Sequence, residues 1–410
     1  MPIIHSFKAI LPHPAKAEKL VIHLENLSLE SAKEIRSINP ESFVHLLVPK
    51  IENHYLRGSK TEITFQKIAE NFDDFIQKNI LIKDDTANIY IYRQENSQHS
   101  YTGIWTASSI DDYINNKIKK HELTRAEREK GLIEYLQQTG IDANPVLITY
   151  PENQKLEAII KNEINKDSAI KISLDGTDHQ VWRVSDLGKV NEITQIFKEM
   201  PDTYIADGHH RAAAASTYGI ERRKLNLKHK GTEDYNFFSS VYISANQLSI
   251  LPFHRFVKLT ERQNSNDIIA SIRKEFELTE IDVKDLIPTR PHFVGLYIQH
   301  KAYQINLINH LKNDVLADLD VSIIQEKILG PLFQIDNPRE DQRLQFVGGV
   351  VDLPTYIKKV DEGVFDMGFL LFPISVAELI KIADMGEIMP PKSTWFEPKF
   401  LAGLITHQIN

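Results

Sequence analysis

The densest group of chemically active side chains in the sequence is the run Asp207-Gly208-His209-His210-Arg211. It places a carboxylate, two imidazoles and a guanidinium around one glycine. Gly208 lets an anion approach the backbone, and Arg211 can bind two phosphate oxygens at once. Asp207 or one of the histidines can hold a proton or a metal ion. These residue types favour phosphate, proton or metal chemistry at this run.

The residues on either side of the run predict a strand, a tight turn and a helix. The apolar residues 204–206 are typical of a short buried strand, Asp207-Gly208 of a turn, and the alanines at 212–215 of the start of a helix. This arrangement points the first N–H groups of the helix toward a bound anion. A purely structural interpretation stays open, in which Asp207 caps the helix and the histidines form a local hydrogen-bond cluster.

A second polar pair, His121-Glu122, lies between two predicted helices at 109–119 and 124–138. In such a short link, Glu122 can act as a general base and His121 as a ligand or proton partner. The alternative is an ordinary solvated pair.

Two further groups lie in the second half of the chain. Lys392-Ser393-Thr394 is similar to the end of a Walker loop, but the upstream glycines of that loop are absent, so it is no P-loop. Two prolines before a lysine and two hydroxyls can still make a rigid loop that contacts anions, or a stiff loop packed by neighbouring aromatic rings. Arg255 follows His254 on a predicted strand, 250–257, and faces either a site or the wet side of a sheet.

Composition bounds the class of protein. The chain has 410 residues, which fits two or three subdomains, and its 48 basic and 56 acidic residues give a net charge of −8. This charge gives no overall positive field for nucleic acid or an anionic membrane. The absence of cysteine excludes disulfides, a thiol nucleophile and a zinc–thiolate site. The start has no signal-peptide pattern, and we expect a cytoplasmic protein without a membrane or nucleic acid partner.

The order of predicted elements indicates an α+β fold, because hairpins replace a strict alternation of strands and helices. A capping pair at Ser59 and Glu62 predicts a helix whose apolar face runs from residue 65 to 76. We place boundaries near residues 115 and 258. They give an N-terminal α+β subdomain (1–115), a central unit (116–258) and a C-terminal α+β subdomain (259–410) that contains the Pro-Pro-Lys-Ser-Thr loop.

Four ordered motifs resemble those of the domain of unknown function 1015 family of bacteria and archaea. They are His121 to Thr124, Tyr204 to Arg211, Ile250 to Arg255, and Met389 to Thr394 with Phe396 to Lys399. The family's Pro-Pro-Tyr-Asp-Val type of segment near the start is replaced by Leu11-Pro-His-Pro14. The resemblance therefore assigns no role to the first sixty residues.

The resemblance implies a fold and a ligand. The Asp-Gly-His-His-Arg turn is similar to the phosphate-contacting turn of the ParB and sulfiredoxin superfamily, whose members bind nucleotides there. One branch that resembles this motif phosphorylates free serine. By this analogy we expect a ParB/sulfiredoxin-like central unit that binds ATP or ADP with Mg²⁺, flanked by N- and C-terminal α+β subdomains.

The resulting hypothesis is a nucleotide-dependent phosphotransferase that acts on a small hydroxyl metabolite, with free L-serine as one candidate. Backbone N–H groups from Gly208 to Arg211 and the Arg211 side chain would bind the phosphates. Asp207 would hold Mg²⁺, with His209 or His210 close to it.

The hypothesis assigns the remaining polar groups to proton transfer and phosphate binding. Glu122 would accept the proton of the substrate hydroxyl, with His121 beside it. Lys392 would neutralise the transferring phosphoryl group. Further contacts to the cofactor would come from Arg255, Ser393 and Thr394.

Two other classes of function stay open. A non-catalytic, nucleotide-sensing or partner-binding ParB-like module would keep a ligand at the turn and would not depend on Glu122. A metal-dependent hydrolase would use Asp207, His209 and His210. Adjacent histidines on a helix point about 100° apart and rarely bind one ion together.

Overall fold

The computed structural model describes residues 2–25, 27–48 and 63–410. Its internal contacts divide the chain into two compact units. The first unit is Met1–Leu248 with Pro398–Asn410, and the second unit is Ser249–Glu397. The chain therefore leaves the first unit once and returns to it for its last residues. The three-part division with boundaries near 115 and 258 stays a prediction.

The first unit is built on a mixed sheet. Most neighbouring strands are antiparallel, but β13 pairs with β9, and β12 with β7, in parallel. In the described residues the order of the sheet is β10 (Ile170–Leu174), β11 (Thr177–Val184), β5 (Ile89–Glu95), β6 (Ser100–Ser109), β13 (Phe237–Ser244), β9 (Val146–Tyr150), β12 (Thr203–Asp207) and β7 (Ile118–Lys119), with β1 (Ile4–His5) added to β6. Strands β13 and β9 are buried at every position, in keeping with the mostly apolar sequence of β9, although β13 also buries Ser239, Ser240 and Ser244.

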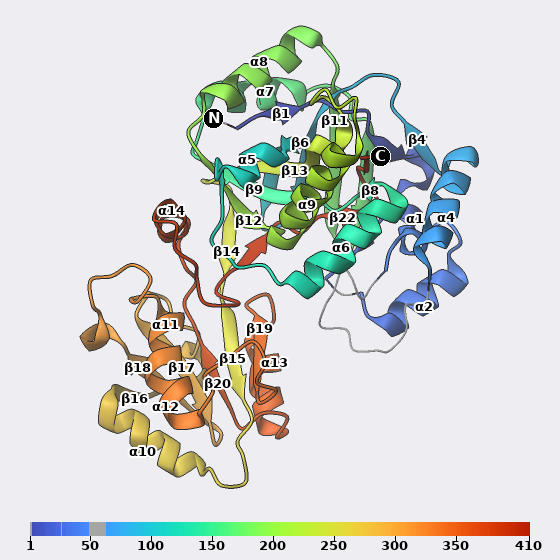
Figure 1. Cartoon of the computed structure of the whole chain (residues 1–410). Helices are drawn as coiled ribbons and strands as arrows, with labels where there is room; N and C mark the ends of the chain where they lie inside the picture. The colour runs from blue at the N-terminus through green and yellow to red at the C-terminus, as the bar shows by residue number, and fades with distance from the viewer. Residues whose placement is uncertain (1, 26, 49–62) are drawn as a thin grey trace. The chain divides into compact units, whose positions relative to one another are not determined.

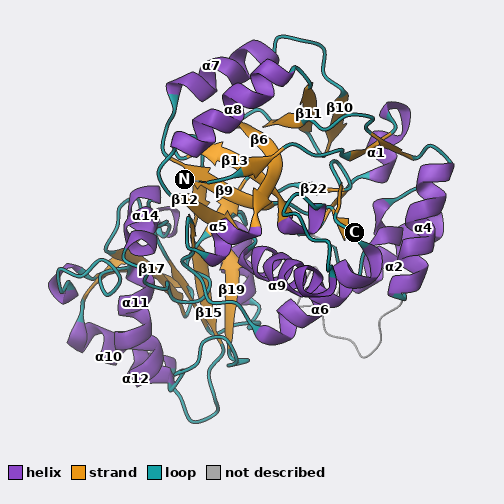
Figure 2. Cartoon of the chain, turned by 45° about the horizontal axis from the view of Figure 1, so that its top comes forward, coloured by secondary structure: helices purple, strands orange, loops and turns teal. Residues whose placement is uncertain are grey.

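Helices pack around this sheet. Figure 1 and Figure 2 show α6 and α9 side by side, and α7 next to α8. In the described residues, the α-helices of the first unit are α1 (Ala17–Leu20), α2 (Leu29–Ile38), α4 (Phe65–Gln77), α5 (Ile110–Ile114), α6 (Ala126–Thr139), α7 (Gln154–Glu163), α8 (Leu187–Glu199) and α9 (His209–Leu225). No helix in the described part of the chain is long and apolar enough to cross a membrane.

Two predicted helices differ in their bounds from the observed ones. α4 is capped by the side chain of Thr64, which accepts from the backbone N of Lys67, while the predicted capping pair of Ser59 and Glu62 lies outside the described residues. The helix expected at 109–119 ends at Ile114, because Asn116 has a left-handed φ of 55°. The chain then forms β7, which joins the sheet.

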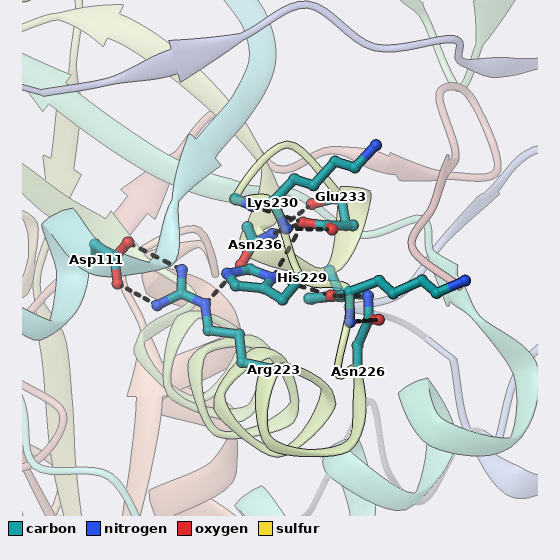
Figure 3. Close-up of polar contacts among 10 residues, drawn as sticks. Asp111, Arg223, Asn226, His229, Lys230, Glu233 and Asn236 are labelled. Carbon is teal, nitrogen blue, oxygen red and sulfur yellow. Dashed lines mark hydrogen bonds and ion pairs between the residues drawn. The ribbon is translucent and has the colours of Figure 1, made fainter.

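The C-terminal end of α9 is fastened by a polar cluster (Figure 3). The guanidinium of Arg223 donates to both carboxylate oxygens of Asp111 at 2.6 and 2.9 Å, and to Asn236 at 2.6 Å. Glu233 accepts from the backbone N of Lys230 at 2.7 Å and lies 3.1 Å from Nδ1 of His229. These contacts fix the helix whose other end carries the predicted site.

The second unit is a separate antiparallel sheet. In the described residues its order is β16 (Glu277–Ile281), β18 (Lys301–Asn306), β17 (Phe293–Ile298), β20 (Met367–Leu370), β15 (Phe253–Val257) and β19 (Leu344–Gly348). Both faces are covered, since Leu296 and Tyr297, adjacent on β17, belong to two different apolar clusters. The helices of this unit are α10 (Ser265–Glu275), α11 (Asp320–Ile324), α12 (Gly330–Phe333), α13 (Leu353–Asp361) and α14 (Val376–Asp384).

A two-stranded ribbon marks the entry to the second unit and the exit from it. β14 (Ser249–Leu251) pairs in antiparallel with β21 (Trp395–Glu397), so that Ser249 faces Glu397 and Leu251 faces Trp395. Helices and largely antiparallel sheets in both units confirm the predicted α+β class.

Candidate functional site

The turn after β12 has the predicted strand-turn-helix form. Gly208 adopts a left-handed φ of 96°, and its carbonyl accepts from the backbone N of Arg211 at 2.9 Å and of Ala212 at 3.0 Å, which starts α9. Oδ1 of Asp207 accepts from the backbone N of Gly208 at 2.8 Å. The N-cap residue is Gly208, which makes no side-chain capping bond to the first turn of α9. Asp207 is therefore not the helix cap, and the N-terminus of α9 can interact with an anion.

Arg211 folds back over this turn. A Cβ at position 208 would lie 2.9 Å from both Nε and Nη2 of Arg211, so the guanidinium occupies the space that only a glycine leaves open. Nη2 lies 3.9 Å from Oδ2 of Asp207, and the buried Nε has no hydrogen-bond partner among the described residues. The guanidinium of Arg211 is thus held beside the N-terminus of α9, and its Nε–H can still donate to a ligand.

Lys399 reaches the turn from the far end of the chain. Its Nζ lies 2.8 Å from Oδ2 of Asp207. Burial of the half-buried carboxyl group would raise its pKa, but the charges of Lys399 and Arg211 outweigh burial and hold the pKa of Asp207 well below its usual range. Asp207 is therefore ionised at neutral pH.

Glu25 interacts electrostatically with Lys399. β22 (Leu401–Ala402) pairs in antiparallel with β3 (Ile22–His23), with Leu401 facing His23, and continuing this register sets Lys399 opposite Glu25. Glu25 keeps solvent exposure, yet partial loss of hydration raises its pKa, and the charge of Asp207 raises it further. Lys399 and Arg211 act in the opposite direction. A second carboxylate thus belongs to the site.

The sequence did not identify Glu25 or Lys399 as site residues. Lys399 lies in a motif that carried the family resemblance, and this was the only indication in the sequence that it has a role. Glu25 lies in a turn without any recognisable pattern.

His121 and Glu122 are brought to the turn by a strand pair that the sequence did not predict. β7 runs parallel to β12, and residues that follow the ends of parallel neighbours lie at the same edge of a sheet. Oε2 of Glu122 lies 3.7 Å from Nδ1 of His209. The backbone N of His121 lies 3.5 Å from Nε2 of His209, and the two rings meet edge to face at 4.4 Å. The structure therefore brings both predicted residues next to His209.

Both of these imidazoles are neutral at neutral pH. Burial lowers the pKa of His209 to about 4, and burial together with the nearby His209 lowers the pKa of His121 well below its usual value. They can orient Glu122 and the turn, but they do not add positive charge to the site.

His210 faces away from His209. Its Nε2 accepts from the backbone N of Arg125 at 3.0 Å, at the residue that precedes α6. His210 thus connects the start of α9 to the start of α6. Within the described residues, no group of three or more acidic or histidine side chains could hold a metal ion.

An apolar pocket lies behind the turn, with Arg211 in its wall. The empty space among its lining atoms is about 480 Å³ and includes open solvent, so it is not a closed cavity of that size. Leu132 and Tyr135 of α6 and Phe238 of β13 supply apolar surface, and Asn144 is among its few polar residues. Such a combination of apolar walls and few polar groups is typical of small-molecule sites.

The other predicted cofactor-binding residues, Arg255, Lys392, Ser393 and Thr394, belong to the second unit. Nη2 of Arg255 donates to the carbonyl of Pro391 at 3.3 Å, directly before Lys392. The hydroxyl of Ser393 donates to the carbonyl of Pro390 at 2.7 Å, and Thr394 precedes β21. The structure thus joins Arg255 to the predicted loop within one unit.

Three solved structures show low similarity to the chain. A free serine kinase in complex with AMP is 14% identical, with 75% of this chain and 91% of that chain covered and a TM-score of 0.36. A conserved hypothetical protein from Pyrococcus furiosus is 15% identical, with 75% and 95% covered and a TM-score of 0.37. SbnI with a C-terminal truncation, from Staphylococcus aureus, is 13% identical, with 73% and 85% covered and a TM-score of 0.38.

No curated protein matches the chain. The model of one protein family, described as "Protein of unknown function (DUF1015)", matches residues 4–322, which is more than half of the chain. This match agrees with the resemblance seen in the four motifs. The chain therefore belongs to the DUF1015 family.

Proposed function

We propose that the chain binds ATP or ADP at the turn Asp207–Arg211 and transfers a phosphoryl group to the hydroxyl of a small metabolite, with free L-serine as a candidate acceptor. The observation that carries this proposal is the position of Arg211. Its guanidinium is held over Gly208, beside the uncapped start of α9, with the buried Nε unsatisfied among the described residues. A phosphate would satisfy the guanidinium and the helix terminus together.

The apolar pocket offers a place for the rest of the nucleotide. Because Arg211 lies in its wall, phosphates at the turn would leave the base and sugar close to the surface formed by α6 and β13. Tyr135 and Phe238 supply aromatic surface there, on which a base can pack.

Mg²⁺ is implied by the family resemblance and would reach the turn bound to the nucleotide. Proteins usually hold Mg²⁺ through one or two carboxylates, with phosphate oxygens and water completing its shell. Asp207 is ionised and half-buried, so it suits the role of a protein ligand. When bound, the ion would neutralise charge on the phosphates.

Glu122 is the proposed general base. Its side chain is 41% exposed and therefore accessible to a substrate hydroxyl, while the buried His209 lies 3.7 Å away. We assign His121 and His209 the role of positioning Glu122, and His210 the role of positioning α6. Glu25 is a second candidate base, because its raised pKa brings it closer to neutral pH, where proton transfer is most effective.

A nucleotide-sensing, ParB-like module without turnover is the second candidate function. The 3.7 Å between Glu122 and His209 exceeds a hydrogen bond, so this contact orients the carboxylate less tightly than a hydrogen bond would. The arrangement gives a metal-dependent hydrolase no support, because His209 and His210 turn their Nε2 atoms to two different backbone N–H groups.

Turnover distinguishes the two candidates. The purified protein is incubated with ATP or ADP, Mg²⁺ and a pool of hydroxyl metabolites that includes L-serine, and ³¹P NMR and mass spectrometry search for a phosphorylated product. The transferase requires a product that depends on Arg211, tested with Arg211→Met. Arg222→Met, on the last turn of the same helix, is the matched control.

Nucleotide binding is measured in parallel by calorimetry. Binding without product in wild type would identify a sensor. If wild type binds neither ATP nor ADP, both candidates are wrong.

A further inference from the structure

Arg255 is a buried cation of the second unit. It lies on β15, between β19 and β20, and the residue is 3% exposed. Its Nη1 donates to the carbonyl of Phe253, its Nη2 donates to the carbonyl of Pro391 at 3.3 Å, and the guanidinium lies 5.1 Å from the ring centroid of Phe346. None of these contacts among the described residues is with a carboxylate.

This burial is unusual for an arginine. Arginine is rarely fully buried unless it is paired, since backbone carbonyls and a ring face do not cancel its charge. Burial lowers the pKa of Arg255 to about 9, and no neighbouring carboxylate raises it again. The group still carries its proton at neutral pH. A buried, charged guanidinium without an acidic partner is what an anion-binding site contains before its ligand is bound.

A second cation lies beside it. The Nζ of Lys392 is 4.8 Å from the ring centroid of Phe253, whose carbonyl accepts from Arg255. Arg255 also holds Pro391, the residue directly before Lys392. Arg255 and Lys392 therefore both contact Phe253, and Arg255 also contacts the loop that carries Lys392.

The loop that carries Lys392 is preformed. Pro390 and Pro391 fix their own φ angles, and the hydroxyl of Ser393 closes the loop by donating to the carbonyl of Pro390 at 2.7 Å. Lys392 has a left-handed φ of 54°, a conformation that non-glycine residues adopt at a cost and that clusters at functional sites. The local structure keeps the lysine in place before any ligand binds.

We propose that Arg255 and the loop Pro390–Ser393 bind a doubly charged oxyanion, either inorganic phosphate or the phosphate of a phosphomonoester. Two cations match a dianion better than a singly charged carboxylate, and the donors of a guanidinium suit phosphate oxygens. This site goes beyond the proposed function, because it lies in the second unit and requires no nucleotide at the Asp207 turn.

Calorimetric titration of the full chain with inorganic phosphate, at an ionic strength held constant with NaCl, tests the site. Phenyl phosphate and acetate are the parallel ligands. We expect saturable binding of phosphate or of the phosphomonoester, and at least tenfold weaker binding of acetate. Binding of only one phosphate ligand identifies the source of the group. Acetate binding as tight as phosphate binding, or no saturable binding at all, would overturn the proposal.

Substitutions test whether Arg255 and Lys392 form the site. Arg255→Met and Lys392→Met should each weaken binding at least tenfold, while the exposed Arg262→Met, in the same unit, should not. Arg211→Met should remove any phosphate bound at the Asp207 turn and keep the binding that Arg255→Met and Lys392→Met weaken, which separates the two sites. Lys392 is only partly buried, so its variant carries the test if Arg255→Met does not fold. Wild-type affinity in a folded Arg255→Met or Lys392→Met protein contradicts the proposal.

Discussion

The Nζ of Lys399 lies 2.8 Å from Oδ2 of Asp207, although 192 residues separate the two in the chain. The contact exists because the last segment returns to the first unit after the second unit is complete. This segment is firmly packed, since Phe400, Leu401 and Leu404 are buried. Lys399, in the C-terminal segment, therefore completes the nucleotide site proposed at the Asp207 turn.

Replacement of this lysine should weaken the site without unfolding it. Lys399→Met removes the closest cation from Asp207, so the pKa of Asp207 should rise toward its ordinary value. We expect nucleotide affinity to fall about tenfold, which corresponds to about 1.4 kcal/mol of binding free energy. Calorimetry with ADP measures the affinity, and ¹³C NMR of the carboxyl groups measures the pKa. The exposed Lys198→Met is the control, and equal affinity in both variants would remove Lys399 from the site.

Gly208 offers a sharper test because the chain contains a matched glycine. Gly208 and Gly176 both have left-handed φ angles, of 96° and 75°, but a Cβ at Gly176 meets nothing within 4 Å. Alanine at either position should cost about 1–2 kcal/mol of stability, since L-residues are strained in this conformation. Only Gly208→Ala also displaces the guanidinium of Arg211, and so only this variant should lose nucleotide affinity, by at least tenfold.

Thermal unfolding and nucleotide titration of the two variants check this pair. If Gly208→Ala loses stability but keeps wild-type affinity, phosphate binding does not require the Arg211 side chain to lie over Gly208. A comparable loss of affinity in Gly176→Ala would mean that the effect is one of stability alone.

The turn was predictable from sequence because its determinants are local. An apolar strand, a glycine and an alanine-rich helix follow one another at Tyr204–Ala215, and each acts on the backbone within a few residues. The position of Glu122 beside His209 was a hypothesis that local patterns could not establish. It depends on β7, a strand of two residues that occupies the last two positions of the helix predicted at 109–119.

Glu25 and Lys399 show why the rest was not predictable. The two residues come close because β3 pairs with β22. Each of these strands is two residues long, and about 380 residues lie between them in the chain. Strands this short have no periodicity to detect. Their pairing follows from the fold of the whole first unit, and no local pattern near Glu25 encodes it.

The ribbon of β14 and β21 predicts that the second unit can be removed. Leu251 and Trp395 face each other in antiparallel register, so an Asn-Gly turn between them would close a two-residue hairpin in place of residues 252–394. We expect the shortened chain to fold and to bind nucleotide like the full chain, because Arg211, Asp207 and Lys399 all belong to the first unit. Circular dichroism and calorimetry measure both properties. A folded product without nucleotide affinity would place part of the nucleotide site in the second unit.

The assignment of Glu122 as the general base is tested by comparing its glutamine variant with the same substitution at two other glutamates. If the chain is a phosphotransferase, Glu122→Gln should lower turnover by about 10²–10⁴-fold, the usual contribution of a general base, while nucleotide affinity stays unchanged. Glu127→Gln, exposed in the first turn of α6, should have no effect. Steady-state kinetics with the identified acceptor measures turnover. If Glu25→Gln causes this loss and Glu122→Gln does not, Glu25 is the base.

The buried histidine of the second unit makes stability depend on pH. Nδ1 of His254 accepts from the backbone N of Leu371 at 3.1 Å, and burial, assisted by the charge of Arg255, lowers its pKa to about 3. In the unfolded chain a histidine titrates near pH 6.5, so between these values the unfolded state binds the proton and the folded state does not. The contribution of His254 is therefore complete above about pH 6.5 and is lost as the pH falls toward 3.

Between pH 7 and pH 5 this linkage should cost wild type about 2 kcal/mol of unfolding free energy. His254→Asn keeps an acceptor for Leu371 and does not titrate, so its loss over the same range should be smaller by that amount. Urea unfolding at both pH values measures the difference, and contributions of the first unit cancel because the two proteins share it. His300→Asn, at a histidine whose side chain is 75% exposed, should behave like wild type. Equal pH dependence of His254→Asn and wild type would show that His254 is protonated in the folded protein as readily as in the unfolded chain.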